Sequence, residues 1–150
     1  YIAPNLTAIK QSRSNKLFEE LCEKHWQPWL GLAFERFCIK NAGYISECLG
    51  FADDVIDLGP LFIKGEEGFQ IDYLFRRSDS TIVLCEIKYH DNAIGTEIIP
   101  EIERKLQLLK KYSKFTIEKV LITVNGITES LKQSEYFHQV LDINDLLVLP

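Results

Sequence analysis

The stretch FQIDYLFRRSDSTIVLCEIKYH, residues 69–90, decides the fold, because it holds two apolar runs that flank a polar turn. The pattern predicts a β-hairpin with strands over residues 69–76 and 81–89. Three charged residues, Asp72, Glu86 and Lys88, lie inside the apolar runs. Burying an isolated charge is costly unless the charge is paired or bound to a metal, so we expect these residues to serve chemistry.

The loop of this hairpin decides which charges meet, because side chains alternate between the two faces of a strand. Glu86 and Lys88 therefore point to the same face. A three-residue loop centred on Asp79 places Asp72 opposite Glu86, on that face too. A two-residue loop shifts the pairing by one residue and separates the two carboxylates. Both registers are open from the sequence, and the first of them brings the three charges together.

Segments outside the hairpin predict further strands and helices. Residues 55–63 fit a strand, suited to a sheet edge, that is bent or bulged at Gly59 and Pro60. A helix that begins near Glu97 precedes residues 120–124, an apolar run typical of a central strand. A strand in that position pairs parallel to an earlier one through a crossover. The other expected elements are helices at about 14–26, 29–42 and 127–137, and a strand with a helical turn at 140–148.

These elements together predict an α/β sandwich. Its central sheet is mixed, with an antiparallel meander and one parallel strand after a crossover helix, and helices flank it. Two large aromatic residues at helical spacing, Trp26 and Trp29, are expected in the core.

The charged residues of the hairpin suggest a metal site. Two carboxylates, Asp72 and Glu86, and the backbone carbonyl of Ile87 offer the hard oxygen ligands that Mg²⁺ or Mn²⁺ prefers. Lys88 has two candidate roles: it could orient or help deprotonate an attacking water, or it could donate to charge that develops on a phosphate. Glu35, in the helix before the hairpin, could bind a second metal or hold the water if that helix packs on the same face.

Three motifs carry a resemblance to a known family, and they are GLAFERF at 31–37, FQIDYLF at 69–75 and VLCEIKY at 83–89. They resemble the PD-(D/E)XK nuclease superfamily, which has the restriction-endonuclease-like fold. More narrowly, they resemble the C-terminal domain found behind an ATP-hydrolysing domain in a family of archaeal and bacterial ATPases. The resemblance covers roughly residues 29–125.

Carried over by position, the resemblance implies metal ligands at Asp72 and Glu86, a catalytic Lys88 and an accessory Glu35. It implies a Mg²⁺- or Mn²⁺-dependent hydrolase that cleaves phosphodiester bonds in DNA. The family's nominal proline before the aspartate is replaced here by Ile71. The chain has no phosphate loop of the type G-x-x-x-x-G-K-[ST], so an ATPase activity would belong to another part of a longer protein.

The distribution of charge indicates where DNA would bind. A net charge of −5 argues against a protein whose whole surface contacts nucleic acid. Residues 104–119 nevertheless hold six basic residues and one acidic residue. The expected buried stripe of the helix there is Ile99, Ile102, Leu106 and Leu109, which leaves its basic residues on other faces. The candidate nucleic-acid contacts are Arg76, Arg104, Lys105 and Lys111.

Composition also sets expectations for the domain and its compartment. Residues 1–13 lack a clear period and predict a tail or linker before a single domain at 14–150. The chain contains no methionine, which suggests a piece of a longer protein, and the resemblance implies an N-terminal ATPase domain as its partner. Four cysteines without a C-x-x-C pair predict reduced core residues in a cytoplasmic protein. No run approaches the roughly 20 apolar residues of a membrane span. The sequence leaves open whether the protein forms a homo-oligomer.

A second class of function stays open beside the nuclease. The domain could be a catalytically silent module that docks protein or DNA within a larger ATPase. Lys88 would then only neutralise Asp72 and Glu86 in a buried network.

Overall fold

The computed structural model describes residues 3–11, 16, 23–64, 68–110 and 114–147. Within these ranges the strands are β1 (Val55–Ile63), β2 (Phe69–Arg77), β3 (Thr81–Lys88), β4 (Thr116–Thr123) and β5 (Gln139–Asp142). The α-helices are α1 (Leu6–Gln11), α3 (Glu23–Lys40), α4 (Ala42–Cys48), α5 (Ile99–Lys110), α6 (Glu129–Gln133) and α7 (Ile143–Leu147). Short 3₁₀ helices lie at Ala3–Asn5, Ala52–Asp54 and Thr96–Ile98.

The five strands form a mixed sheet in the order β1-β2-β3-β4-β5. The first three strands are an antiparallel meander, and β4 pairs parallel to β3. Helix α5 lies between β3 and β4 in the chain, so the predicted crossover and mixed sheet are confirmed. β5 adds a second parallel strand at the far edge.

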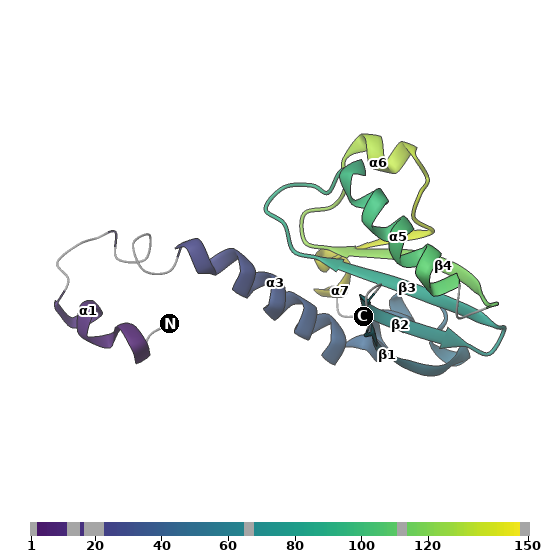
Figure 1. Cartoon of the computed structure of the whole chain (residues 1–150), viewed down its shortest axis with the longest axis horizontal. Helices are drawn as coiled ribbons and strands as arrows, with labels where there is room; N and C mark the ends of the chain where they lie inside the picture. The colour runs from purple at the N-terminus through teal and green to yellow at the C-terminus, as the bar shows by residue number, and fades with distance from the viewer. Residues whose placement is uncertain (1–2, 12–15, 17–22, 65–67, 111–113, 148–150) are drawn as a thin grey trace.

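Helices cover both faces of the sheet, as Figure 1 shows with α5 and α6 on one side and α3 and α7 on the other. On the α5 side, Ile102 and Leu106 pack with Leu84 of β3 and Leu121 of β4. On the α3 side, helix residues pack with the alternate strand residues, and this core includes Phe34, Cys38, Ile45, Val83, Cys85, Ile122 and Leu146. The α/β sandwich predicted from the periodic segments is therefore present.

The loop between β2 and β3 has three residues, 78–80, and Ser80 adopts a left-handed backbone with φ of 64°. Tyr73 pairs with Cys85, and each step from there toward the loop keeps the same register. Extending this register by one residue places Asp72 opposite Glu86. The first of the two registers left open by the sequence is confirmed.

A bulge interrupts β2 beside Asp72. Between the pairs Gly59–Leu74 and Leu61–Ile71, β2 advances by one residue more than β1. Ile71 consequently packs in the core on the α5 side, whereas Tyr73 packs in the core on the α3 side. Residues two apart on a regular strand share a face, so the extra residue reverses the alternation at Asp72. The irregularity expected at Gly59 is present, and its extra residue belongs to β2.

The N-terminal helical region differs from the sequence-based prediction. Helix α3 continues through Pro28, where two separate helices were expected, and the part predicted at 14–22 lies almost wholly outside the described residues. A proline removes one backbone hydrogen bond from a helix, and α3 extends for five residues before Pro28 and twelve after it. The prediction that Trp29 is a core residue is wrong, because 46% of it is exposed and its ring stacks on Trp26 at 5.0 Å between centroids. Among the cysteines expected in the core, Cys38 and Cys85 are buried, but Cys48 is exposed.

The two ends of the chain differ in how they relate to the core. No residue of the 3₁₀ helix Ala3–Asn5 or of α1 is buried, and Figure 1 shows α1 apart from the sheet. At the other end, β5 and α7 form the expected strand and helical turn. In the part of the chain that the structure describes, no helix is long and apolar enough to cross a membrane.

Candidate functional site

Five charged side chains gather where the C-terminal end of β3 meets the first half of α5. We call them the charge cluster, and its members are Asp72, Glu86, Lys88, Glu101 and Lys105. Glu86 is its centre, because its side chain is 0% exposed and points toward α5, as do its strand neighbours at positions 82 and 84. A carboxylate buried this deeply needs partners that neutralise it.

Two lysines supply that neutralisation. The Nζ of Lys105 donates to both carboxylate oxygens of Glu86, at 2.8 Å to Oε1 and 2.7 Å to Oε2. The Nζ of Lys88 lies 2.9 Å from Oε1 of the same carboxylate. The Lys105 side chain is 6% exposed and that of Lys88 is 34% exposed, so Lys105 closes the inner side of the cluster and Lys88 faces its opening.

Glu101 forms the outer side of the cluster. Its Oε1 lies 3.2 Å from the Nζ of Lys105, one helical turn away, and 3.7 Å from the Nζ of Lys88. The Glu101 side chain is 49% exposed. Burial raises the pKa of Glu101, but the two ammonium groups outweigh it and the net pKa is lowered. Glu101 therefore stays ionised and links the buried pair to solvent.

Asp72 joins the cluster from β2. Its Oδ2 accepts a hydrogen bond of 3.0 Å from the backbone N–H of Ile87, so the carboxylate contacts the backbone of β3 just beyond Tyr73 and Cys85, the last paired residues at this end of the two strands. Burial, and then the nearby charge of Glu86, raise the pKa of Asp72 to about 6. The Ile87 hydrogen bond and the two lysines oppose this rise without cancelling it.

The electrostatics of Lys88 favour one of its two candidate roles. Burial lowers the pKa of Lys88, but the charge of Glu86 and its hydrogen bond to the ammonium raise the pKa above its ordinary value. At neutral pH this side chain is therefore an ammonium. It can donate hydrogen bonds to a developing negative charge, and it is a poor general base.

The donor set fits a hard divalent cation in its chemistry. Asp72 of β2 and Glu86 of β3 offer carboxylate oxygens close enough for the charge of Glu86 to raise the pKa of Asp72, and Ile87, the residue after Glu86, offers a backbone carbonyl. Within the described residues, no group of three or more His, Cys, Asp or Glu side chains is arranged to hold a metal. Mg²⁺ commonly uses one or two carboxylates, with waters and substrate phosphates completing its octahedron. A cation, the Lys105 ammonium, already lies on Glu86.

Glu35 is not brought into the charge cluster. Helix α3 packs through Phe34 and Cys38 on the face opposite to α5, so the condition for a role of Glu35 at Glu86 is not met. Glu35 is half-buried and lies near the thiol of Cys38. Burial is the main reason that the pKa of this thiol rises to about 12, and the charge of Glu35 also raises it.

The candidate nucleic-acid contacts fall into three groups. Arg104 and Arg76 are exposed, and Arg76 lies 3.6 Å from the carboxylate of Asp57. Lys111 lies outside the described residues. The prediction that Lys105 lies on an outer face of its helix is wrong, because its ammonium is buried against Glu86.

A signal for Lys105 and Glu101 was present in the sequence. Lys105 stands three residues after Ile102 and one before Leu106, so it falls within the apolar stripe of α5. A lysine inside such a stripe needs a buried acid, and Glu86 in its apolar strand needs a base. Glu101 lies four residues before Lys105, the spacing that pairs charges on one helical face.

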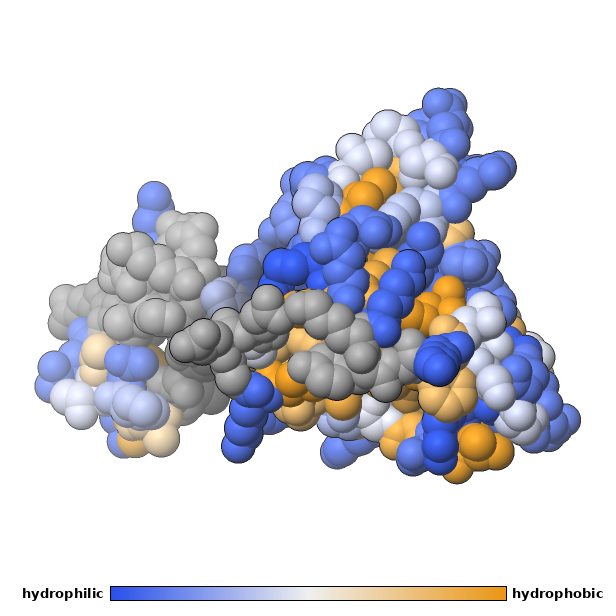
Figure 2. Space-filling view, turned by 45° about the vertical axis from the view of Figure 1, so that its right-hand side comes forward, coloured by the Kyte–Doolittle hydropathy of each residue, from blue (hydrophilic) through white to orange (hydrophobic). Residues whose placement is uncertain are grey.

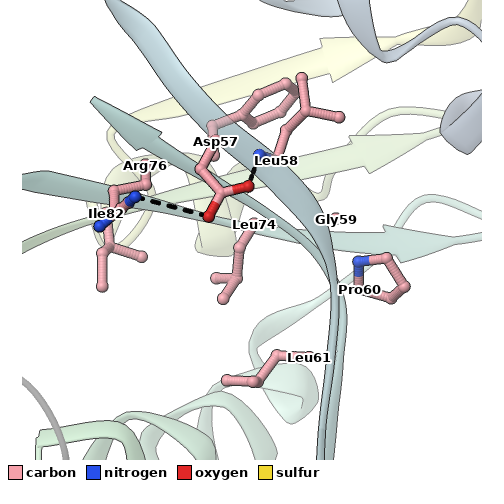
Figure 3. A pocket seen from close by; sticks show the side chains of 9 residues that line it. Asp57, Leu58, Gly59, Pro60, Leu61, Leu74, Arg76 and Ile82 are labelled. Carbon is pink, nitrogen blue, oxygen red and sulfur yellow. Dashed lines mark hydrogen bonds and ion pairs between the residues drawn. The ribbon is translucent and has the colours of Figure 1, made fainter. Parts of the chain in front are cut away.

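Apolar features of the surface lie elsewhere. Figure 2 shows hydrophobic residues that reach the surface in several places among hydrophilic ones. On β1, Ile56, Leu58 and Phe62 are exposed. Figure 3 shows a hollow beside β1 that Leu61, Leu74 and Ile82 help to line, with the Asp57–Arg76 ion pair at its rim. The lining of this hollow includes no member of the charge cluster.

No protein-family model, curated protein or solved structure matches this chain.

The raised pKa of Asp72 predicts a pH-dependent gain in stability for Asp72→Asn. The carboxyl has an ordinary pKa of 3.8 and a folded pKa of about 6, so its ionisation costs the folded state free energy as pH rises. The asparagine oxygen can still accept the Ile87 hydrogen bond. We expect Asp72→Asn to raise the free energy of unfolding by about 1–3 kcal/mol above pH 7, and to have no such effect below about pH 4.

Urea unfolding between pH 4 and pH 8, in EDTA, measures this effect. Asp53→Asn is the matched control, because Asp53 is exposed, and it should stay within about 0.5 kcal/mol of wild type throughout. An Asp72→Asn gain that is the same at pH 4 and pH 8 would contradict the prediction.

Proposed function

We propose that this domain is a Mg²⁺- or Mn²⁺-dependent nuclease with a restriction-endonuclease-like fold that hydrolyses phosphodiester bonds in DNA. The observation that carries the proposal is the register of the β2–β3 hairpin, which sets Asp72 opposite Glu86 with Lys88 at the opening of the same cluster. These residues are the ones that the resemblance to the PD-(D/E)XK superfamily implies. The sheet supports the same assignment, because two of the motifs lie in its antiparallel meander and a crossover helix and a parallel strand follow them.

The residues have separate roles in this proposal. Asp72 and Glu86, with the carbonyl of Ile87, would hold the metal ion. When bound, such an ion neutralises charge on the phosphate and lowers the pKa of a coordinated water. Lys88 remains an ammonium because of Glu86, and the Nζ of this partly exposed side chain donates to the phosphate oxygens as negative charge builds on them. Glu101 keeps Lys88 aimed along the rim of the cluster.

DNA would approach over the rim of the cluster. Arg104 is exposed on α5, the helix that carries Glu101 and Lys105, and Arg76 is exposed on β2. Guanidinium groups at such positions bind backbone phosphates without reading the bases. We also propose that Lys111 contacts a phosphate, and that the domain is cytoplasmic and follows an N-terminal ATPase domain in a longer protein.

Cleavage of supercoiled plasmid tests the function. Wild-type protein with Mg²⁺ or Mn²⁺ should nick the plasmid, and EDTA should stop it. Asp72→Asn should lose the activity while remaining folded, and Asp53→Asn, a chemically matched exposed change, should retain it. Failure of the wild type to cleave linear, supercoiled and single-stranded DNA with both ions overturns the nuclease proposal.

A second candidate is a catalytically silent module that docks protein or DNA within a larger ATPase. The observation that favours it is the full pairing of Glu86, whose two oxygens already bind ammonium groups. This alternative predicts that Mn²⁺ leaves the thermal unfolding midpoint unchanged at millimolar concentration. The nuclease predicts a rise, because a ligand that binds the folded state stabilises it.

A further inference from the structure

The charge cluster contains one residue that the proposed nuclease does not use. Lys105 is the buried base of α5, whereas Arg104 and Lys110 of the same helix are exposed. Its ammonium spans both oxygens of Glu86 at 2.8 and 2.7 Å. A divalent cation that used Glu86 would need at least one of these oxygens. Lys105 and the cation therefore require the same atoms.

A cation and the ammonium cannot share Glu86 without cost. Like charges a few ångströms apart repel strongly where water is excluded, and Glu86 is fully buried. The Lys88 ammonium repels a bound cation less strongly, because its side chain is partly exposed and can turn outward. Lys105 is almost wholly enclosed, so it must move to another acceptor if a metal ion takes Glu86.

The structure contains such an acceptor one helical turn away. Glu101 Oε1 lies 3.2 Å from the Nζ of Lys105, closer than its 3.7 Å to the Nζ of Lys88. Since Glu101 and Lys105 belong to the same helix, a change of partner needs rotation about side-chain bonds only. The half-exposed carboxylate of Glu101 can follow the ammonium as it leaves Glu86.

We infer that Lys105 is a built-in competitor of the divalent cation, and that it exchanges Glu86 for Glu101 when the metal ion binds. This inference rests on the proposed metal-dependent function. It makes Lys105 a positioning residue that weakens metal binding in the free domain. Glu101 has the opposite effect, because it stabilises the position that Lys105 takes when Glu86 is free to bind the ion.

Mn²⁺ binding to the isolated protein, measured by the electron paramagnetic resonance signal of the free ion, tests the inference without an activity assay. Lys105→Met should bind Mn²⁺ at least about tenfold more tightly than wild type, which corresponds to about 1.4 kcal/mol. Glu101→Gln should bind more weakly than wild type. Lys110→Met is the matched control, because it removes the same charge from an exposed position of α5 and should leave the affinity unchanged.

The outcomes separate the inference from the function on which it rests. Equal Mn²⁺ affinity of wild type and Lys105→Met overturns the competition but leaves the metal site standing. A lack of Mn²⁺ binding by both proteins at millimolar concentration overturns the metal site and the inference together. If Lys105→Met does not fold, Glu101→Gln decides between the outcomes, because Glu101 is half-exposed and its substitution should leave the domain folded. Mn²⁺ binding by Glu101→Gln that is unchanged or tighter than that of wild type overturns the exchange.

Discussion

Lys88→Ala should lower the rate of plasmid cleavage by about 10²–10³-fold at saturating Mn²⁺. This is the range observed when one preorganised donor to a developing charge is removed. The structure supports that role because Glu86 holds the Lys88 ammonium in place at 2.9 Å and raises its pKa. Glu86 keeps its bidentate partner Lys105 in the variant, so the loss should come from chemistry and not from unfolding.

Stability and metal binding distinguish this catalytic role from a structural one. Lys88→Ala should lower the free energy of unfolding by about 1 kcal/mol or less, because its ion pair is partly screened by solvent. Its Mn²⁺ affinity should rise slightly or stay unchanged, since one positive charge near the ion is lost. Lys40→Ala, at an exposed lysine of α3, is the control for removal of one charge. Cleavage by Lys88→Ala at the wild-type rate would remove Lys88 from the mechanism.

Local sequence patterns predicted the hairpin and the mixed sheet well. Alternation and turn chemistry are local properties, and they determine the β2–β3 hairpin once the loop length is chosen. The loop length itself depended on Ser80, which adopts a positive φ that serine seldom takes, and the sequence alone left it open. The crossover from β3 to β4 followed from a helix that precedes an apolar strand.

The site was predicted in part. Asp72, Glu86 and Lys88 could be proposed because they are charges inside apolar strands. Lys105 was assigned to an outer face because a lysine in an amphipathic helix is usually solvent-exposed. Lys105 is buried because it pairs with Glu86, an acid from a different element. This pairing is a tertiary contact between residues 19 positions apart, so local sequence patterns do not contain it.

The position of Asp72 shows a second limit of local patterns. A regular β2 would keep Ile71 and Tyr73 on one face, but the bulge sends them to opposite cores. The bulge arises from the mismatch with β1, which the sequence of β2 does not contain. A neighbouring strand therefore decides where the alternation of β2 is broken.

The largest effect on stability should follow from Glu86→Leu, which we expect to lower the free energy of unfolding by about 3–5 kcal/mol. The change leaves the Lys105 ammonium buried with only the half-exposed Glu101 as partner. Lys105→Met should cost about 1 kcal/mol, because Glu86 then keeps Lys88 as its partner. The double variant Glu86→Leu with Lys105→Met replaces the pair with apolar groups of similar size, and it should recover most of the loss.

Urea unfolding of the four proteins in EDTA gives the coupling energy between Glu86 and Lys105. We expect the double variant to be more stable than the sum of the single changes predicts, by about 2–4 kcal/mol. Additive losses would mean that Glu86 is held mainly by Lys88, and that Lys105 is no obstacle to a metal ion. A strong coupling combined with tighter Mn²⁺ binding by Lys105→Met would show that one buried ion pair stabilises the free domain and restrains its metal site. The charge cluster then favours folding at the expense of metal affinity, as expected where a functional site conflicts with the stability of its own fold.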